Sequence, residues 1–190
     1  MTSSSARNPT PPRGYLAVIR TIDKLTDVIS YLFVIVIVPL ILANVVEVFA
    51  RYVLRAPTVW ALDVTTMSYA TLCMVGAALA LLRGAHVRTD MLWERFSDRT
   101  KGMIDSVALA VFFLPTMAVL FFISIDDFLY SVSIDERSSS GAWTPILWPL
   151  RGIIPLTAFM LFLQGISELM KSVWAWRTGE FLTVHEKIEV

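Results

Sequence analysis

The stretch VISYLFVIVIVPLILANVV, residues 28–46, decides the fold, because none of its side chains carries a charge. An α-helix rises 1.5 Å per residue, so about 20 residues cross a hydrocarbon core of roughly 30 Å. The run is longer than the apolar part of a cleaved signal peptide, and no convincing cleavage site follows it. We therefore expect a retained membrane-spanning helix over about 28–50. Pro39 should kink this helix, because proline donates no backbone hydrogen bond.

Three further apolar runs of similar length follow along the chain. They predict membrane-spanning helices at about 60–82, 104–125 and 152–169. Hydrophobic residues make up 56% of the 190 positions and charged residues only 17%, whereas a soluble domain is about a quarter charged. The sequence therefore predicts an all-α membrane protein with four transmembrane helices plus short interfacial amphipathic helices.

The amphipathic segments lie beside the first and third spans. In residues 15–27, apolar side chains recur at helical spacing between charged ones, which suits a helix on the membrane surface or one leading into the first span. Residues 83–101 mix apolar and charged side chains in the same way. Residues 1–14 have the composition of a disordered tail, and residues 173–190 form a second polar tail. The four-helix domain is expected over 15–172.

The distribution of lysine and arginine predicts the orientation. Positive residues favour the cytoplasmic side of a membrane. Twelve of the sixteen lie before the first span, between spans two and three, or after the fourth span, and only Arg51, Arg55, Arg137 and Arg151 lie on the other side. We therefore expect a multi-pass protein of the bacterial inner membrane with both termini in the cytoplasm.

Glu47 is the acidic residue nearest the middle of the first span. A charge at the centre of a span costs about 2.5–3.5 kcal/mol on insertion scales, and less near its ends. Arg51 follows one helical turn later, so the simplest interpretation is a local ion pair that fixes the depth of the helix. A polar contact to another subunit or to Asp63, and a site that carries a proton or cation, are the alternatives.

The second span begins with Trp60 at the membrane interface and Asp63 in its first turn. An acid at this position complements the helix dipole, and pairing with Arg51 or Arg55 is compatible with that role. Farther along, small residues are spaced four apart, as in Cys73 with Ala77 and Gly76 with Ala80. Such spacing lets helix backbones approach closely, within the chain or in a partner.

Sequence signals for catalysis or cofactor binding are missing. His86, near Arg83 and Asp90 at the inner interface, is more simply a hydrogen-bonding surface group than a ligand. The sequence has no catalytic triad, phosphate-binding glycine loop or metal-ligand spacing, and a zero net charge argues against nucleic-acid binding. We expect no enzymatic activity and no cofactor or metal.

The order of these features resembles the small integral-membrane (DctQ-type) subunit of tripartite ATP-independent periplasmic (TRAP) transporters over about residues 19–172. The residues that carry the resemblance are Glu47, Arg51-Tyr52, Pro57, Trp60, Asp63, Gly76-Ala77-Ala78, Arg83-Gly84, His86, Asp90, Trp143, Pro145, Pro149-Leu150-Arg151, Pro155 and Gln164.

The resemblance implies a supporting role in transport. In that family a periplasmic binding protein delivers an organic acid or similar solute to a large permease subunit, and an ion gradient drives uptake. The small subunit is non-catalytic and packs beside the large one in the lipid bilayer. The resemblance therefore implies a stable complex with the large permease and transient contact with the binding protein.

A small proton-coupled exporter that uses Glu47 as its substrate site is the alternative function. It would need a buried acid near the middle of the membrane. Glu47 lies near a helix end, with Arg51 close by, which favours the supporting subunit.

Overall fold

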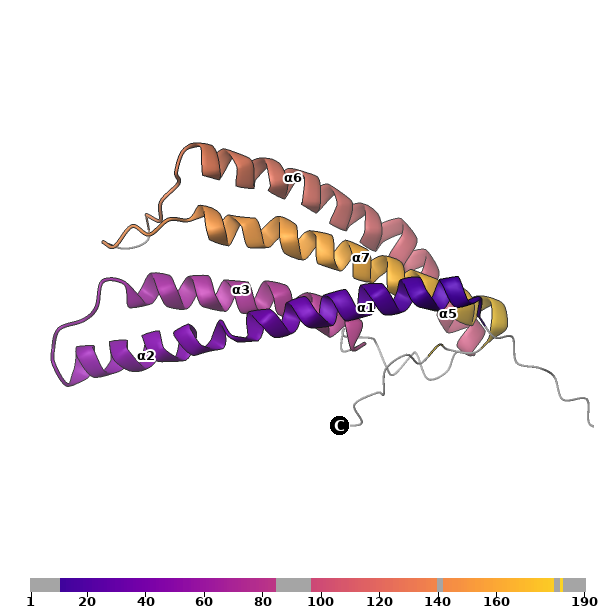
Figure 1. Ribbon diagram of the computed structural model, residues 1–190, viewed down its shortest axis with the longest axis horizontal. Helices are drawn as coiled ribbons and strands as arrows, with labels where there is room; N and C mark the ends of the chain where they lie inside the picture. Colours follow the sequence, from indigo (N-terminus) through magenta and orange to yellow (C-terminus); the bar gives the residue numbers. More distant parts are fainter. Residues whose placement is uncertain (1–10, 85–96, 140–141, 180–181, 183–190) are drawn as a thin grey trace, which may run out of the picture.

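The computed structural model describes residues 11–84, 97–139, 142–179 and 182. In these residues the regular elements are helices: α1 (Arg13–Val34), α2 (Ile37–Tyr52), α3 (Ala61–Leu82), α5 (Asp98–Ala108), the π-helix η1 (Leu109–Phe113), α6 (Leu114–Ser133) and α7 (Trp148–Thr178). Helices α1 and α2 follow each other almost in line, and α5, η1 and α6 form one continuous rod (Figure 1). Among the described residues, four helical runs are thus long and apolar enough to cross a membrane, as the sequence predicts.

The helix of the first span is interrupted just before Pro39, the residue at which the sequence predicts a kink. Helix α1 ends at Val34 and α2 begins at Ile37. Because Pro39 has no N–H, the carbonyl of Ile35 lacks its usual partner four residues on, and the N–H of Val38 donates to it instead at 3.1 Å. The amphipathic segment 15–27 is the first half of α1, so it leads into the span rather than forming a helix of its own.

Helix α7 is the centre of the bundle. It packs against α1, α3, α5, η1 and α6, whereas α2 packs mainly against α3. Figure 1 shows α7 between α6 and α3, with α1 and α5 meeting it at the same end of the molecule. Among the described helices, α7 has the most buried residues, ten, followed by α3 with eight.

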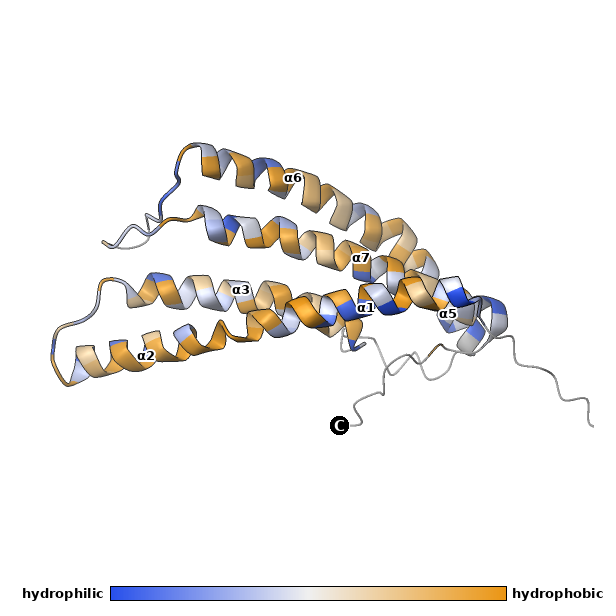
Figure 2. Cartoon of the chain, viewed as in Figure 1, coloured by the Kyte–Doolittle hydropathy of each residue, from blue (hydrophilic) through white to orange (hydrophobic). Residues whose placement is uncertain are grey.

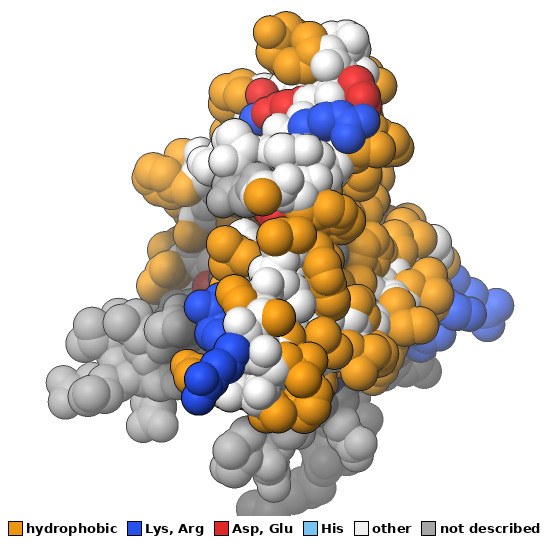
Figure 3. Space-filling model, turned by 90° about the vertical axis from the view of Figure 1, so that its left-hand side faces the viewer, with side chains coloured by type: hydrophobic (Ala, Val, Ile, Leu, Met, Phe, Trp, Pro, Cys, Tyr) orange, Lys and Arg blue, Asp and Glu red, His pale blue; other side chains and the backbone are white. Residues whose placement is uncertain are grey.

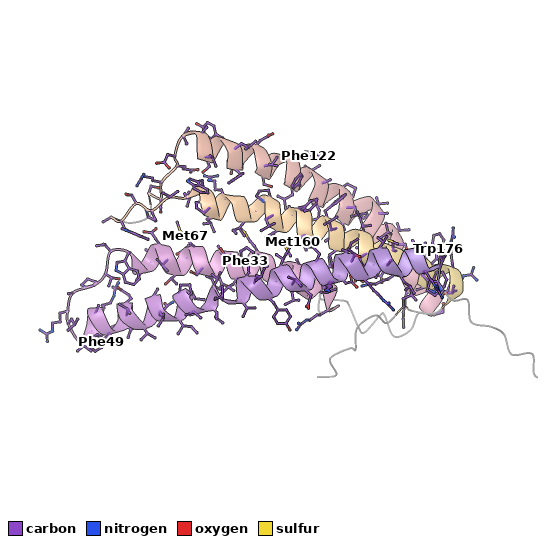
Figure 4. The ribbon with its side chains drawn as sticks, viewed as in Figure 1. Phe33, Phe49, Met67, Phe122, Met160 and Trp176 are labelled. Carbon is purple, nitrogen blue, oxygen red and sulfur yellow. The ribbon has the colours of Figure 1, made fainter. Side chains whose placement is uncertain are left out.

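Large apolar side chains cover the outside of the bundle. Phe49 of α2 is 54% exposed and Phe122 of α6 is 66% exposed, whereas Met160 of α7 is 3% exposed (Figure 4). Figure 2 shows mostly apolar residues along α2 and α6 and more polar residues on α5 and the first turns of α1. This pattern is the reverse of a soluble bundle and fits helices whose surroundings are lipid.

Local signals set several helix ends. Ser97 caps α5, where its hydroxyl accepts a hydrogen bond from the Thr100 N–H at 3.4 Å. Pro149 lies in the first turn of α7, and Gly179 ends that helix with a φ of 77°, a conformation that glycine adopts without strain.

The expected interfacial segment 83–101 is described only at its two ends. Residues 85–96, which include His86 and Asp90, lie outside the described residues.

Candidate functional site

A buried polar cluster joins α1 to α7. The carboxylate of Asp23 accepts hydrogen bonds from Gln164 at 3.0 Å and Ser167 at 2.7 Å, both on one oxygen. Its other oxygen lies 2.8 Å from the ammonium nitrogen of Lys171. Asp23 is only 1% exposed. Two hydrogen bonds and one ion pair thus replace the water that this carboxylate loses on burial.

Two more side chains complete this inner cluster. Lys171 also pairs with Glu168 at 2.8 Å, and the amide oxygen of Gln164 accepts a hydrogen bond from Thr26 at 3.0 Å. The inward face of α1 is consequently polar, since its buried residues are Ile19, Asp23, Thr26 and Ser30. The amphipathic pattern alone would have placed the charged side chains of this segment in water.

A second polar cluster lies between α2 and α3, at the opposite end of the bundle. One oxygen of Glu47 accepts a hydrogen bond from the Arg51 Nε at 2.8 Å. The other oxygen accepts a hydrogen bond from the Thr58 backbone N–H at 2.9 Å and a second one from the Thr58 hydroxyl. The ion pair that the sequence suggests is therefore present, and Thr58 is a partner that the sequence analysis missed.

This Glu47 cluster closes the connection between the two helices. The connection passes through Arg55, which has a φ of 53°. A hydrogen bond from Thr58 to Glu47 ties it to α2. Next to it, the amide of Asn44 donates to the Thr65 hydroxyl at 3.3 Å. An open groove of about 350 Å³ lies over Glu47, Arg51 and Thr58.

Asp63 does not contact the arginines that the sequence suggested. Its side chain is 3% exposed, and one oxygen accepts a hydrogen bond from the Ser138 hydroxyl at 2.9 Å. Arg51 is paired with Glu47 instead. Asp63 does lie in the first turn of α3, where a carboxylate complements the helix dipole. Thus it anchors the loop between α6 and α7 onto α3.

That loop is a short hairpin held at its base by Arg151. Arg137 and Ile146 form a β-bridge, and the Leu147 N–H donates to the Glu136 carbonyl at 2.8 Å. The guanidinium group of Arg151 lies 2.6 Å from the Glu136 carboxylate and also pairs with Asp127. Figure 3 looks onto this end of the molecule and shows acidic and basic side chains side by side at the top of the view.

The environment of Glu136 favours its charged form. The Ser131 hydroxyl and the Arg151 guanidinium beside it lower the pKa of the Glu136 carboxyl. The sequence did not predict the pairing of Glu136 with Arg151, which lie 15 residues apart.

The two interfacial residues of α3 lie at its two ends. Trp60 is the N-cap residue of the helix, and its carbonyl accepts the Val64 N–H at 3.1 Å. Arg83 is the C-cap residue. Its guanidinium donates to the Tyr31 hydroxyl at 3.1 Å and lies 3.9 Å from Asp27. Arg83 therefore ties the end of α3 to α1.

The small residues of α3 that the sequence singles out, Gly76, Ala77 and Ala80, are not fully buried within the chain. Gly76 is exposed, and a Cβ built on it would meet no atom within 4 Å. Ala77 and Ala80 are half-buried. The close helix contact lies elsewhere: a Cβ on Gly102 of α5 would come within 2.6 Å of the Trp176 backbone nitrogen in α7.

The signals for the missed residues were weak in the sequence. Gln164, Ser167 and Lys171 are polar residues at spacings of three and four in an otherwise apolar helix, which marks one helical face. Such a face needs a polar partner, and only the packing of α1 on α7 identifies it as Asp23.

Comparison with known proteins gives one match. The family model described as "Tripartite ATP-independent periplasmic transporters, DctQ component" matches residues 40–174. No curated protein and no solved structure matches the chain. The matched region contains α3, α5, η1, α6 and nearly all of α7 and α2. The chain therefore belongs to the DctQ family, the small membrane component of TRAP transporters.

Proposed function

We propose that this chain is the non-catalytic small subunit that supports a large permease subunit in TRAP transport. In this proposal the large subunit moves the solute, an organic acid or a similar compound brought by a periplasmic binding protein. An ion gradient drives uptake by symport. The chain lies in the bacterial inner membrane with both termini in the cytoplasm, and it forms a stable complex with the large subunit.

The observation that carries the proposal is the open face of α3. Its exposed positions, Leu62, Thr66, Tyr69, Cys73 and Gly76, are separated alternately by four and three residues. A second helix that packs at a small crossing angle uses this spacing. A glycine on such a face allows close backbone approach without a hydrophobic driving force.

The other exposed faces have a different composition. Along α2 the exposed side chains include Ile41, Val45 and Phe49, and along α6 they include Val119 and Phe122. These side chains suit lipid. The contrast supports α3, with Gly76, Ala77 and Ala80, as the side that the large subunit covers.

The clusters around Asp23 and Glu47 support a structural role for the polar groups. Both oxygens of each carboxylate contact a donor or cation of the chain itself. A carrier site would need to exchange its partners during each cycle. For this reason we favour a supporting subunit over an exporter that uses Glu47.

Co-purification with the large subunit tests the assembly. Gly76→Leu adds a side chain to the open face and should reduce recovery of a tagged large subunit. Ala110→Leu is the matched control, because Ala110 is an exposed small residue of η1 outside this face. Equal recovery with both variants would exclude α3 as the contact.

Transport assays separate the two functions. Reconstituted alone, the chain should accumulate no solute, and with the large subunit and the binding protein it should support uptake. Glu47→Gln should leave this uptake largely intact when the complex assembles. If the isolated chain transports solute, and Glu47→Gln abolishes that transport, the chain is the exporter instead.

A further inference from the structure

A groove of about 460 Å³ lies between α3, α7 and the rod formed by α5, η1 and α6. Its walls include Leu109, Phe112, Phe113 and Met117. Phe112 is 69% exposed, so the groove opens at the surface of the bundle that faces lipid. The volume lies within the range of small-molecule sites.

One end of the groove is polar and lies at a membrane boundary. Glu168 and Ser172 line this end. Glu168 lies twenty residues after Trp148, the first residue of α7. Twenty helical residues span about 30 Å, which is the thickness of the hydrocarbon core. An occupant that lies along the groove would thus have its apolar part in the membrane core and its polar part at the interface.

The charge at the polar end is negative. Among the residues that the structure describes, Glu168 and Asp23 share one ammonium group, that of Lys171, so this cluster has two acids for one base. The ionisable side chains among the described residues that line the groove are Asp105 and Glu168, and both are acids. A headgroup that ends in a cation would complement the cluster, whereas a headgroup with an anionic phosphate and no cation would be repelled by Glu168.

We propose that this groove binds a phospholipid whose headgroup ends in a primary ammonium, such as phosphatidylethanolamine. An acyl chain lies against the apolar walls formed by Leu109, Phe113 and Met117. The ammonium group donates hydrogen bonds to Glu168 and to the Ser172 hydroxyl at the interface. The site is separate from the open face of α3, which we assign to the large subunit.

The experiment measures which lipids remain on the purified chain. The full chain is extracted in mild detergent from membranes that contain both phosphatidylethanolamine and phosphatidylglycerol, and native mass spectrometry identifies the retained molecules. The wild-type chain should retain one phosphatidylethanolamine molecule. The ratio of phosphatidylethanolamine to phosphatidylglycerol on the protein should be about fivefold higher than in the membrane. This preference corresponds to a difference of about 1 kcal/mol in binding free energy. Glu168→Gln should remove this enrichment and leave the groove occupied without headgroup preference.

A pair of variants tests the position of the lipid. Ala108→Phe should fill the groove and abolish retention, because Ala108 is part of its wall. Ala110→Phe adds the same ring two residues away, outside the described lining, and should retain the lipid. Circular dichroism checks that each variant folds. If Ala108→Phe does not fold, Thr116→Phe replaces it, because Thr116 lines the same groove from α6.

Three results would overturn the proposal. One is retention of phosphatidylglycerol as strong as that of phosphatidylethanolamine by the wild-type chain. Another is undiminished retention by a folded groove-filling variant. The third is loss of the lipid when the large subunit binds, which would assign the groove to a protein helix.

Discussion

The Asp23 carboxylate in α1 lies 2.8 Å from the Lys171 ammonium group in α7. Lys171 is 13% exposed and Asp23 is 1% exposed, so little water reaches either charge. This pair fixes the amphipathic half of α1 against the central helix of the bundle.

Removal of one partner from this pair should destabilise the bundle strongly. Lys171→Met leaves Asp23 buried with an uncompensated charge, which costs on the order of 3 kcal/mol. Thermal unfolding in detergent should show the loss, and Lys24→Met, at an exposed position of α1, should have almost no effect. The double variant Asp23→Asn with Lys171→Met should lose less stability than the sum of the two single variants. Additive losses would show that the two side chains do not interact.

Thr58 should contribute more to stability than Arg51, although Arg51 makes the ion pair. Thr58→Val removes a hydrogen bond to a charged carboxylate, worth about 1.5–3 kcal/mol. Arg51 is 56% exposed, and an exposed ion pair contributes roughly 0–1 kcal/mol. Unfolding midpoints of Thr58→Val and Arg51→Met give the comparison. A larger loss for Arg51→Met would contradict this order.

The loop between α6 and α7 should loosen in acid. The folded structure lowers the pKa of Glu136, through the Ser131 hydroxyl and the Arg151 guanidinium. A carboxyl with a depressed folded pKa stabilises the fold above its unfolded pKa, and this stabilisation is lost as pH falls through the folded value. Protease sensitivity of the loop should therefore increase below about pH 4.5, the ordinary value for a glutamate. Glu136→Gln should show a flatter pH profile, and an unchanged profile would show that another group is responsible.

Two glycine-to-alanine variants should have opposite effects. At Gly102 the added Cβ would lie 2.6 Å from the Trp176 backbone nitrogen and 2.8 Å from the Ser172 carbonyl oxygen. Backbone atoms of α7 cannot move aside locally, so Gly102→Ala should destabilise the isolated chain. At Gly76 the Cβ meets nothing within 4 Å, and alanine is the better helix former by about 1 kcal/mol. Gly76→Ala should therefore leave the isolated chain equally or more stable, as thermal unfolding can measure.

Much of the polar architecture depends on contacts between distant segments. The Glu47–Arg51 pair was predictable, because residues four apart in a helix are neighbours. The partners of Asp63 and Arg151 were not, since Ser138, Asp127 and Glu136 reach them only after the loop between α6 and α7 folds back. The same holds for Gly102, whose contact with α7 depends on how two helices cross.

The sequence by itself determined the number of helical runs apolar enough to cross a membrane and the interruption of the first run before Pro39. Both follow from local causes: the cost of exposing peptide groups to lipid, and the missing N–H of proline. Tertiary structure alone decided that α7 is the central helix, that Asp23 faces inward to Lys171, and that Gly76 of α3 remains uncovered. Hydropathy ranks each residue by its own preference for water, whereas these outcomes depend on which faces of separate helices meet.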